Sequence, residues 1–285
     1  MKQLYIFFLA IVFLNSLNAS TTQKKTLHVK EAVNIAAYSY LKPKRFYKLE
    51  KKTQNKIYTA VLNGVRSYLI DEPSKTILIF RGTVSEENVK TDLSYLPTEF
   101  MGEKNTSVHS GFYDIAKKSL QTYKNFLKKD KPIFVVGHSL GGGVALLSGA
   151  LLYKKGYDVT VYTFGSPAVG NKAFVQTIKG LRHYRYLHEK DLVAKIDKSN
   201  IGFLNKIFTF AKKEIITTFP DQDLANFLQQ LIASIEFNYV HDNYKTVIIT
   251  KPVNTAFRPT NSYLINYILT PAKYHNISTY QRCLQ

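Results

Sequence analysis

The sequence predicts an α/β fold, with a mixed, mostly parallel sheet and helices on both faces. Three observations carry this prediction. Apolar runs of strand length alternate along the chain with longer runs of helical periodicity. The runs 57–62 and 65–70 flank Asn63-Gly64, a dipeptide typical of a two-residue hairpin, so one edge of the sheet is expected to be antiparallel. The run 76–80, TILIF, has no polar face, which places it in the middle of the sheet.

The remaining elements can be placed by the same reasoning. A helical stripe of apolar residues comes first, at 28–41, and a basic linker at 42–52 separates it from the hairpin. After the central strand the pattern predicts a helix that opens at 108–112 and runs to about Leu127, then a strand at 133–136 and a helix at 144–152. A strand at 157–164, a short helix at 172–180 and strands at 183–187 and 246–249 follow.

Composition indicates a folded chain that relies on its core. The chain has 285 residues, of which 45% are hydrophobic and 13% aromatic, enough for one large domain. It has one cysteine, Cys283, so an intrachain disulfide is excluded and the fold must be held by packing.

The first 19 residues have the pattern of a secretory signal peptide. Lys2 is followed by an uncharged apolar run at 4–14 and by a small-residue stretch ending at Ala19. We therefore expect a mature domain at 20–285 and a secreted or periplasmic location. An uncleaved anchor is the alternative, because Leu17 is a poor residue three positions before the cut.

The formal net charge of +19 narrows the choice of partners. Such a charge suits nucleic acid, an anionic lipid surface or an acidic polymer. No nucleic-acid-binding motif is present in the sequence, so we expect no nucleic acid partner. An exported protein meets lipid headgroups, and peripheral contact with an anionic membrane surface fits the charge. Solubility alone explains it equally well.

The segment 133–152 carries the strongest chemical signal. It reads as a buried strand, then Gly137-His138-Ser139-Leu140-Gly141, then an apolar helix. G-x-S-x-G alone is expected by chance in about one chain in ten of this length. Between a strand and a helix it gains meaning, because the sharp turn exposes the serine hydroxyl at the positive end of the helix. Ser139 is therefore a candidate nucleophile.

Several separated motifs resemble one family. In chain order they are FRGT (80–83), VHSGF (108–112), GHSLGG (137–142), YTFGSPAVGN (162–171) and HEKD (188–191). Together they resemble the class 3 lipases, the fungal-lipase-like branch of the α/β-hydrolases, over roughly Leu27 to Leu284. The resemblance implies the α/β-hydrolase fold.

The resemblance also implies roles for individual residues. Ser139 would be the nucleophile and Asp191 the triad acid. The oxyanion hole would be formed by Thr83, through its N–H and hydroxyl, and by the N–H of Leu140. Such chemistry needs no metal and no cofactor, and the sequence has no motif for either.

The histidine of the triad has two candidates. His275 lies in a C-terminal segment that resembles the family's His-x-x-x-x-Tyr, where a short helix follows the base. His241 follows an aromatic segment and leads into the strand at 246–249, where a family histidine is structural. We favour His275. We expect four further histidines to be packing or hydrogen-bonding residues: His28, His109, His138 and His183. We expect His188 to lie near the site without taking part in catalysis.

Two departures from the family pattern matter. The segment 193–196 lacks the two prolines that usually follow the acid. An apparent helical insertion at 198–236 has two amphipathic runs with lysines beside the first, which fits either two helices packed on the core or a lipid-facing cap. The usual lid position, 85–95, is polar.

The favoured interpretation is an exported serine carboxylester hydrolase acting on acyl lipids, a lipase or phospholipase. A feruloyl-type or other soluble-ester esterase is the first alternative. A catalytically silent lipid-binding protein is the second, and retention of Ser139, Asp191, Thr83 and a C-terminal histidine argues against it. A lipid or other ester is the expected substrate.

Overall fold

The computed structural model describes residues 26–41, 55–82, 96–191, 193–195, 239–241, 245–250 and 275–285. The predicted signal peptide at 1–19, the segment at the lid position and the helical insertion at 198–236 lie outside the described residues.

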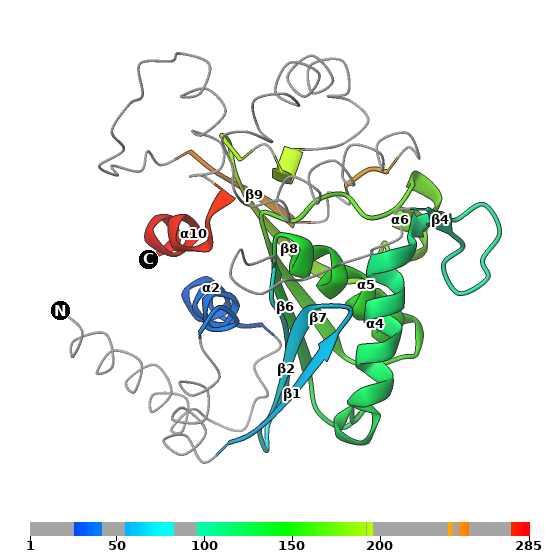
Figure 1. Ribbon diagram of the computed structural model, residues 1–285, viewed down its shortest axis with the longest axis horizontal. Coiled ribbons are helices and arrows are strands. Elements are labelled where there is room, and N and C mark those ends of the chain that lie inside the picture. The colour runs from blue at the N-terminus through cyan, green and yellow to red at the C-terminus, as the bar shows by residue number, and fades with distance from the viewer. Residues whose placement is uncertain are drawn as a thin grey trace.

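The described part of the chain contains a seven-stranded sheet (Figure 1). Its spatial order is β1-β2-β3-β6-β7-β8-β9. The first three strands pair antiparallel, and every pair from β3 onward is parallel. The mixed, mostly parallel sheet is confirmed. Its strands are β1 (Lys56–Leu62), β2 (Val65–Asp71), β3 (Thr76–Phe80), β6 (Ile133–His138), β7 (Val159–Phe164), β8 (Arg182–His188) and β9 (Lys245–Ile249).

The two local predictions about the sheet are also confirmed. Asn63 and Gly64 form the turn between β1 and β2, both with positive φ (46° and 74°), as a tight hairpin of this type requires. Every residue of β3 is buried, since the strand lies between β2 and β6 with helices above and below.

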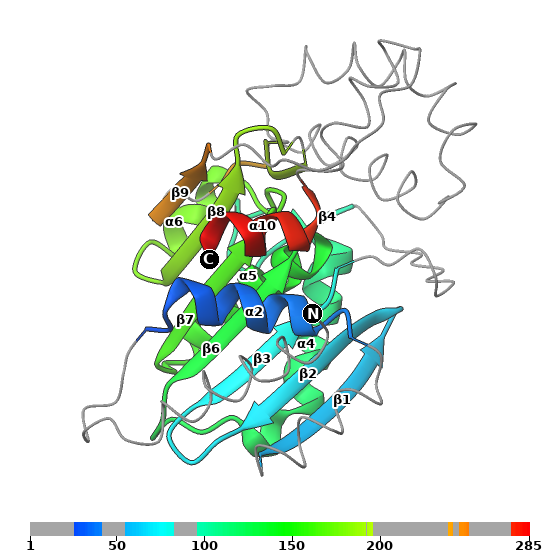
Figure 2. The same ribbon diagram turned by 90° about the vertical axis from the view of Figure 1, so that its left-hand side faces the viewer.

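Helices cover both faces of the sheet (Figure 2). On one face α2 (Val29–Tyr38) and α10 (Ile277–Leu284) pack side by side. On the other, α4 (Ser110–Thr122) packs on α5 (Leu140–Lys154), which lies directly on the central strands, and the short α6 (Lys172–Thr177) adds Phe174 to the same core. The sheet therefore separates two apolar clusters, one per face.

Two details differ from the sequence prediction. The helix that starts at Ser110 ends at Thr122, short of Leu127, and a 3₁₀ turn η1 (Lys124–Phe126) follows. Tyr123 leaves the helix because its phenol is buried and lies 3.0 Å from the Ser67 hydroxyl of β2. A small antiparallel pair, β4 (Pro97–Thr98) with β5 (Val108–His109), has no counterpart in the predicted elements.

Parallel strands bring the ends of β3, β6, β7 and β8 to one edge of the sheet, where α/β folds bind their ligands. Chain segments 81–82, 139–141, 165–171 and 189–191 follow these strands. Among the described residues, no helix is long and apolar enough to cross a membrane.

Candidate active site

Ser139 lies in a strained turn between β6 and α5. Its φ of 57° and ψ of −131° are those of the first central residue of a type II′ turn, a position that normally takes glycine. Backbone hydrogen bonds on both sides hold this conformation. The Ser139 N–H donates to the Phe164 carbonyl at 3.0 Å, and the Gly142 N–H donates to the Ser139 carbonyl at 2.8 Å.

Three side chains predicted from the sequence form a continuous hydrogen-bond chain. His275 Nε2 lies 2.7 Å from Ser139 Oγ. The other ring nitrogen, Nδ1, lies 3.0 Å from both carboxylate oxygens of Asp191. Because an ionised carboxylate only accepts, Nδ1 carries the ring proton, and Nε2 is left to accept from the serine hydroxyl.

Asp191 is fully buried, and its surroundings keep it ionised. Tyr280 Oη donates to its Oδ2 at 2.6 Å, and the Ala194 N–H donates to Oδ1 at 3.3 Å. Burial alone would raise the pKa of Asp191, but the His275 imidazole and these hydrogen bonds outweigh it and hold the pKa below 3.8. The carboxylate can therefore fix the histidine tautomer and stabilise a positive charge on it.

Gly165, directly after β7, makes room for the contact between the acid and the histidine. Its φ is +60°, and a Cβ there would lie 2.8 Å from Asp191 Oδ2 and 3.2 Å from the His275 ring. A larger residue would push these two side chains apart.

The histidines predicted to be structural have structural contacts. His28 and His109 accept at their Nδ1 atoms from N–H groups at the starts of α2 and α4. His183 Nε2 lies 2.8 Å from Thr163 Oγ1. His188 Nδ1 accepts from the Lys190 N–H, and the backbone N–H of His188 donates to Tyr280 Oη. Because Tyr280 Oη also bonds Asp191, His188 lies beside the acid, as predicted.

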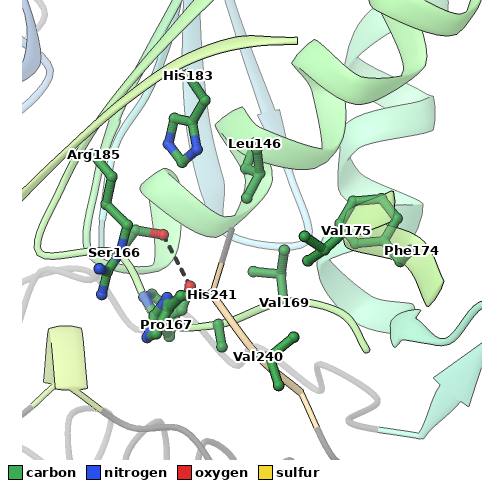
Figure 3. Close-up of a pocket in the computed structure, with 11 residues that line it drawn as sticks. Leu146, Ser166, Pro167, Val169, Phe174, Val175, His183, Arg185, Val240 and His241 are labelled. Carbon is green, nitrogen blue, oxygen red and sulfur yellow. Dashed lines mark hydrogen bonds between the residues drawn. The ribbon is translucent and has the colours of Figure 1, made fainter. Parts of the chain in front are cut away.

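His241 lines a small cavity together with Ser166, Pro167, His183 and Arg185 (Figure 3). None of Ser139, Asp191 and His275 lines that cavity. The cavity volume is about 10 Å³, room for one water molecule. Of the two candidate histidines, His275 is the one bonded to Ser139.

The predicted oxyanion donors are only partly described. Leu140 is the first residue of α5, so its N–H belongs to the unpaired first turn at the positive end of the helix. Thr83 lies outside the described residues. Gly82, which precedes it, is close to the serine, since a Cβ built on Gly82 would lie 3.0 Å from the Ser139 Cβ.

A family model described as lipase (class 3) matches residues 77–200, the segment that carries Ser139 and Asp191. This match and the similarity to fungal lipases support the class 3 lipase family for that segment. The lipase of Rhizopus niveus is 29% identical over 163 residues, which cover 52% of this chain and 42% of that lipase. Toxin TseL of Vibrio cholerae is 43% identical over 105 residues, covering 35% of this chain and 16% of the toxin.

The matched part of the chain thus spans less than half the length of these two curated relatives. Among solved structures, the M37 lipase superposes with a TM-score of 0.58 at 14% identity, covering 88% of this chain and 90% of that one. This likeness concerns the fold alone, and with the strand order it confirms the predicted α/β-hydrolase fold.

Two residues beside the triad candidates were missed by the sequence analysis. Tyr280 stands five positions after His275, in the His-x-x-x-x-Tyr segment used to choose the histidine, so its signal was available. Gly165 stands in the YTFGSPAVGN motif, but which atoms a glycine must admit is visible only when β7 and β8 are placed together.

Proposed function

We propose that this chain is a serine carboxylester hydrolase acting on acyl lipids, a lipase or phospholipase. The observation that carries the proposal is the bond between Ser139 Oγ and His275 Nε2, with Asp191 on the opposite ring nitrogen. This is the arrangement that turns a weak hydroxyl nucleophile into an active one. The match of residues 77–200 to the class 3 lipase model supports an ester as the substrate.

The proposed reaction has two halves with the same proton path. Ser139 Oγ attacks the ester carbonyl and its proton moves to His275 Nε2, where Asp191 stabilises the imidazolium. The bond to the alcohol then breaks, and His275 gives its proton to the departing oxygen. In the second half water attacks the acyl-serine, His275 accepts the proton of the water, and release of the acid returns the proton to Ser139.

The charge that develops on the carbonyl oxygen needs donors. We assign this role to the N–H of Leu140, at the start of α5, and to Thr83, by its position after Gly82 beside the serine. Removing one such donor typically lowers kcat by about 10² to 10³.

Location and surface contact complete the proposal. The apolar N-terminal segment supports export of a domain at 20–285, and the relative from Fusarium solani is named a secreted mono- and diacylglycerol lipase. The net charge of +19 supports peripheral contact with an anionic membrane surface that presents the substrate.

The test is labelling by a fluorophosphonate, which reacts covalently with activated serines, on the intact protein and on Ser139→Ala. We expect stoichiometric labelling at Ser139 and none in the variant. Absence of labelling in both would identify a catalytically silent protein. Turnover of p-nitrophenyl esters of increasing chain length, beside fatty-acid release from phospholipid vesicles, then defines the substrate. Hydrolysis restricted to feruloyl or other soluble esters would contradict the lipid assignment.

A further inference from the structure

A second chain of hydrogen bonds, called the relay below, runs from Tyr40 through His138 to the backbone carbonyl of His275, the candidate base. Tyr40 Oη lies 2.6 Å from His138 Nδ1, and His138 Nε2 lies 2.7 Å from the backbone carbonyl oxygen of His275. A carbonyl can only accept, so the His138 proton is on Nε2. Nδ1 must then accept, and the Tyr40 hydroxyl donates to it.

The relay begins beside the end of β3, where Gly82 packs against Tyr40. A Cβ on Gly82 would lie 2.3 Å from Tyr40 Oη, so the hydroxyl occupies the space that a side chain at position 82 would fill. The two donors therefore point the same way: Tyr40 to His138, and His138 to the His275 carbonyl. Bonds aligned in this way polarise and strengthen one another.

We propose that Tyr40 and His138 are positioning residues that fix the backbone of His275 relative to Ser139 and to the end of β3. The inference rests on the proposed serine-hydrolase function. It goes beyond the triad and the oxyanion donors, because neither Tyr40 nor His138 is needed to bind substrate or move a proton. Each acts through the backbone of another residue.

The position of the two side chains suits this role. His138 is the last residue of β6, next to the serine, and is 4% exposed. Tyr40 stands just beyond α2, the helix that packs on α10, and α10 begins two residues after His275. The chain around His275 is thus anchored by the packing of α10 and, separately, by a bond to its carbonyl.

The relay is uncharged, and its neutrality matters to the base. Burial lowers the pKa of His138 to about 3, helped by the nearby His275, and burial raises the pKa of Tyr40. The His138 and His275 ring centroids are 5.0 Å apart. A cationic His138 would lose its acceptor for Tyr40 and would oppose a positive charge on His275. A neutral His138 can hold the His275 backbone without opposing a positive charge on the His275 ring.

The test uses Tyr40→Phe and a matched control, Tyr162→Phe. Tyr162 is a buried tyrosine on the α2 face, and its hydroxyl bonds the backbone of Leu27 at 2.8 and 3.2 Å, away from the triad. Both variants lose one hydrogen-bonded hydroxyl. Active sites are counted by fluorophosphonate titration, and kcat and KM for p-nitrophenyl butyrate are measured well below each unfolding temperature.

We expect Tyr40→Phe to lower kcat per active site by about 10- to 100-fold with KM unchanged, as small misplacements of a catalytic group do. Tyr162→Phe should lower the unfolding temperature but keep the kcat of the intact protein. His138→Gln places an amide donor near the position of Nε2 and should retain more kcat than His138→Leu, which has no donor.

Three results would overturn the relay: equal kcat in Tyr40→Phe and Tyr162→Phe, a loss confined to KM, or equal kcat in His138→Gln and His138→Leu. Each requires that the intact protein reacts with the fluorophosphonate. No reaction of the intact protein would instead reject the serine-hydrolase function, so the two failures are distinguishable.

Discussion

Tyr280 Oη lies 2.6 Å from Asp191 Oδ2 and ties the C-terminal helix α10 to the carboxylate that holds His275. The same hydroxyl accepts from the His188 N–H at 3.1 Å, so the phenol is fixed by β8 while it donates to the acid. One residue of α10 thereby supports the acid, while His275, just before the helix, contacts both the acid and the serine.

Tyr280→Phe should weaken both activity and stability. A hydrogen bond to a charged group is worth about 1.5–3 kcal/mol, so the free energy of unfolding at pH 7 should fall by about 2 kcal/mol. We expect kcat to fall roughly tenfold, the factor that about 1.4 kcal/mol supplies, because Asp191 stabilises the imidazolium less well.

Urea unfolding of the intact protein and of Tyr280→Phe at several pH values tests the cause. The pKa of Asp191 is lower in the folded protein than the ordinary value of 3.8. The stability that ionised Asp191 contributes is therefore fully present above pH 3.8 and is lost as the pH falls through the lower folded pKa. The stability difference between the two proteins should therefore shrink below pH 3.8. A difference that is constant with pH would assign Tyr280 to packing alone.

His275→Ala and His241→Ala should differ in kind. Loss of one triad member can cost about 10⁶ in kcat, so we expect His275→Ala to match Ser139→Ala. His241 lines the cavity beside Arg185 and His183, and its removal should lower the unfolding temperature while kcat is kept. Steady-state kinetics with thermal unfolding separates the two, and the reverse pattern would reassign the base to His241.

Gly165→Ala should lower both kcat and stability. Its added Cβ would stand 2.8 Å from Asp191 Oδ2, at a φ of +60° that alanine adopts only with strain. The carboxylate must move away, and His275 moves with it. Gly102→Ala is the matched control, because Gly102 also has positive φ, +74°, but nothing lies within 4 Å of its Cβ. Equal kcat in both variants would show that the contact with Asp191 is unimportant.

Two buried neutral histidines should make the fold sensitive to mild acid. Burial lowers the pKa of His109 to about 4 and that of His138 to about 3. Unfolded histidine titrates near 6.5, so between about pH 4 and 6.5 the unfolded chain binds up to two more protons. Stability should then fall as pH falls, by up to about 2.7 kcal/mol per pH unit from these two groups.

Urea unfolding between pH 4.5 and 7.5 measures that slope. His109→Asn keeps an acceptor for the Phe112 N–H at the start of α4 and removes one titrating group. Its slope should be smaller by about one proton. An unchanged slope would show that His109 is not the titrating group.

The sheet could be predicted because its signals are local. β3 reads as central from five consecutive residues, and the turn at Asn63-Gly64 specifies its own φ values. The end of α4 could not be predicted, because Tyr123 leaves the helix for a hydroxyl on Ser67, 56 residues away in the sequence. The spacing of apolar residues along a helix does not indicate a hydrogen-bond partner so distant in the sequence.

The candidate site shows the same division. Ser139 is found from its flanking glycines, and Asp191 and His275 from motifs. Tyr40 and His138, 98 residues apart, and Tyr280 and Asp191, 89 apart, meet only through the topology of the sheet and the pairing of α2 with α10. Hydrogen bonds of this kind depend on distances that no spacing in the sequence encodes.

The backbone angles of Ser139 lower the stability of the folded chain at the residue that carries the candidate reactive hydroxyl. A non-glycine residue at φ 57° and ψ −131° carries about 1–3 kcal/mol of strain, and glycine would relieve most of it. Ser139→Gly should therefore outlast the parent chain on heating, and Ser139→Ala, which keeps the strain, should not. Selection of variants for heat resistance alone would thus favour chains that have lost the Ser139 hydroxyl, the proposed nucleophile. A laboratory that seeks a hardier form of this protein must score hydrolysis in every round.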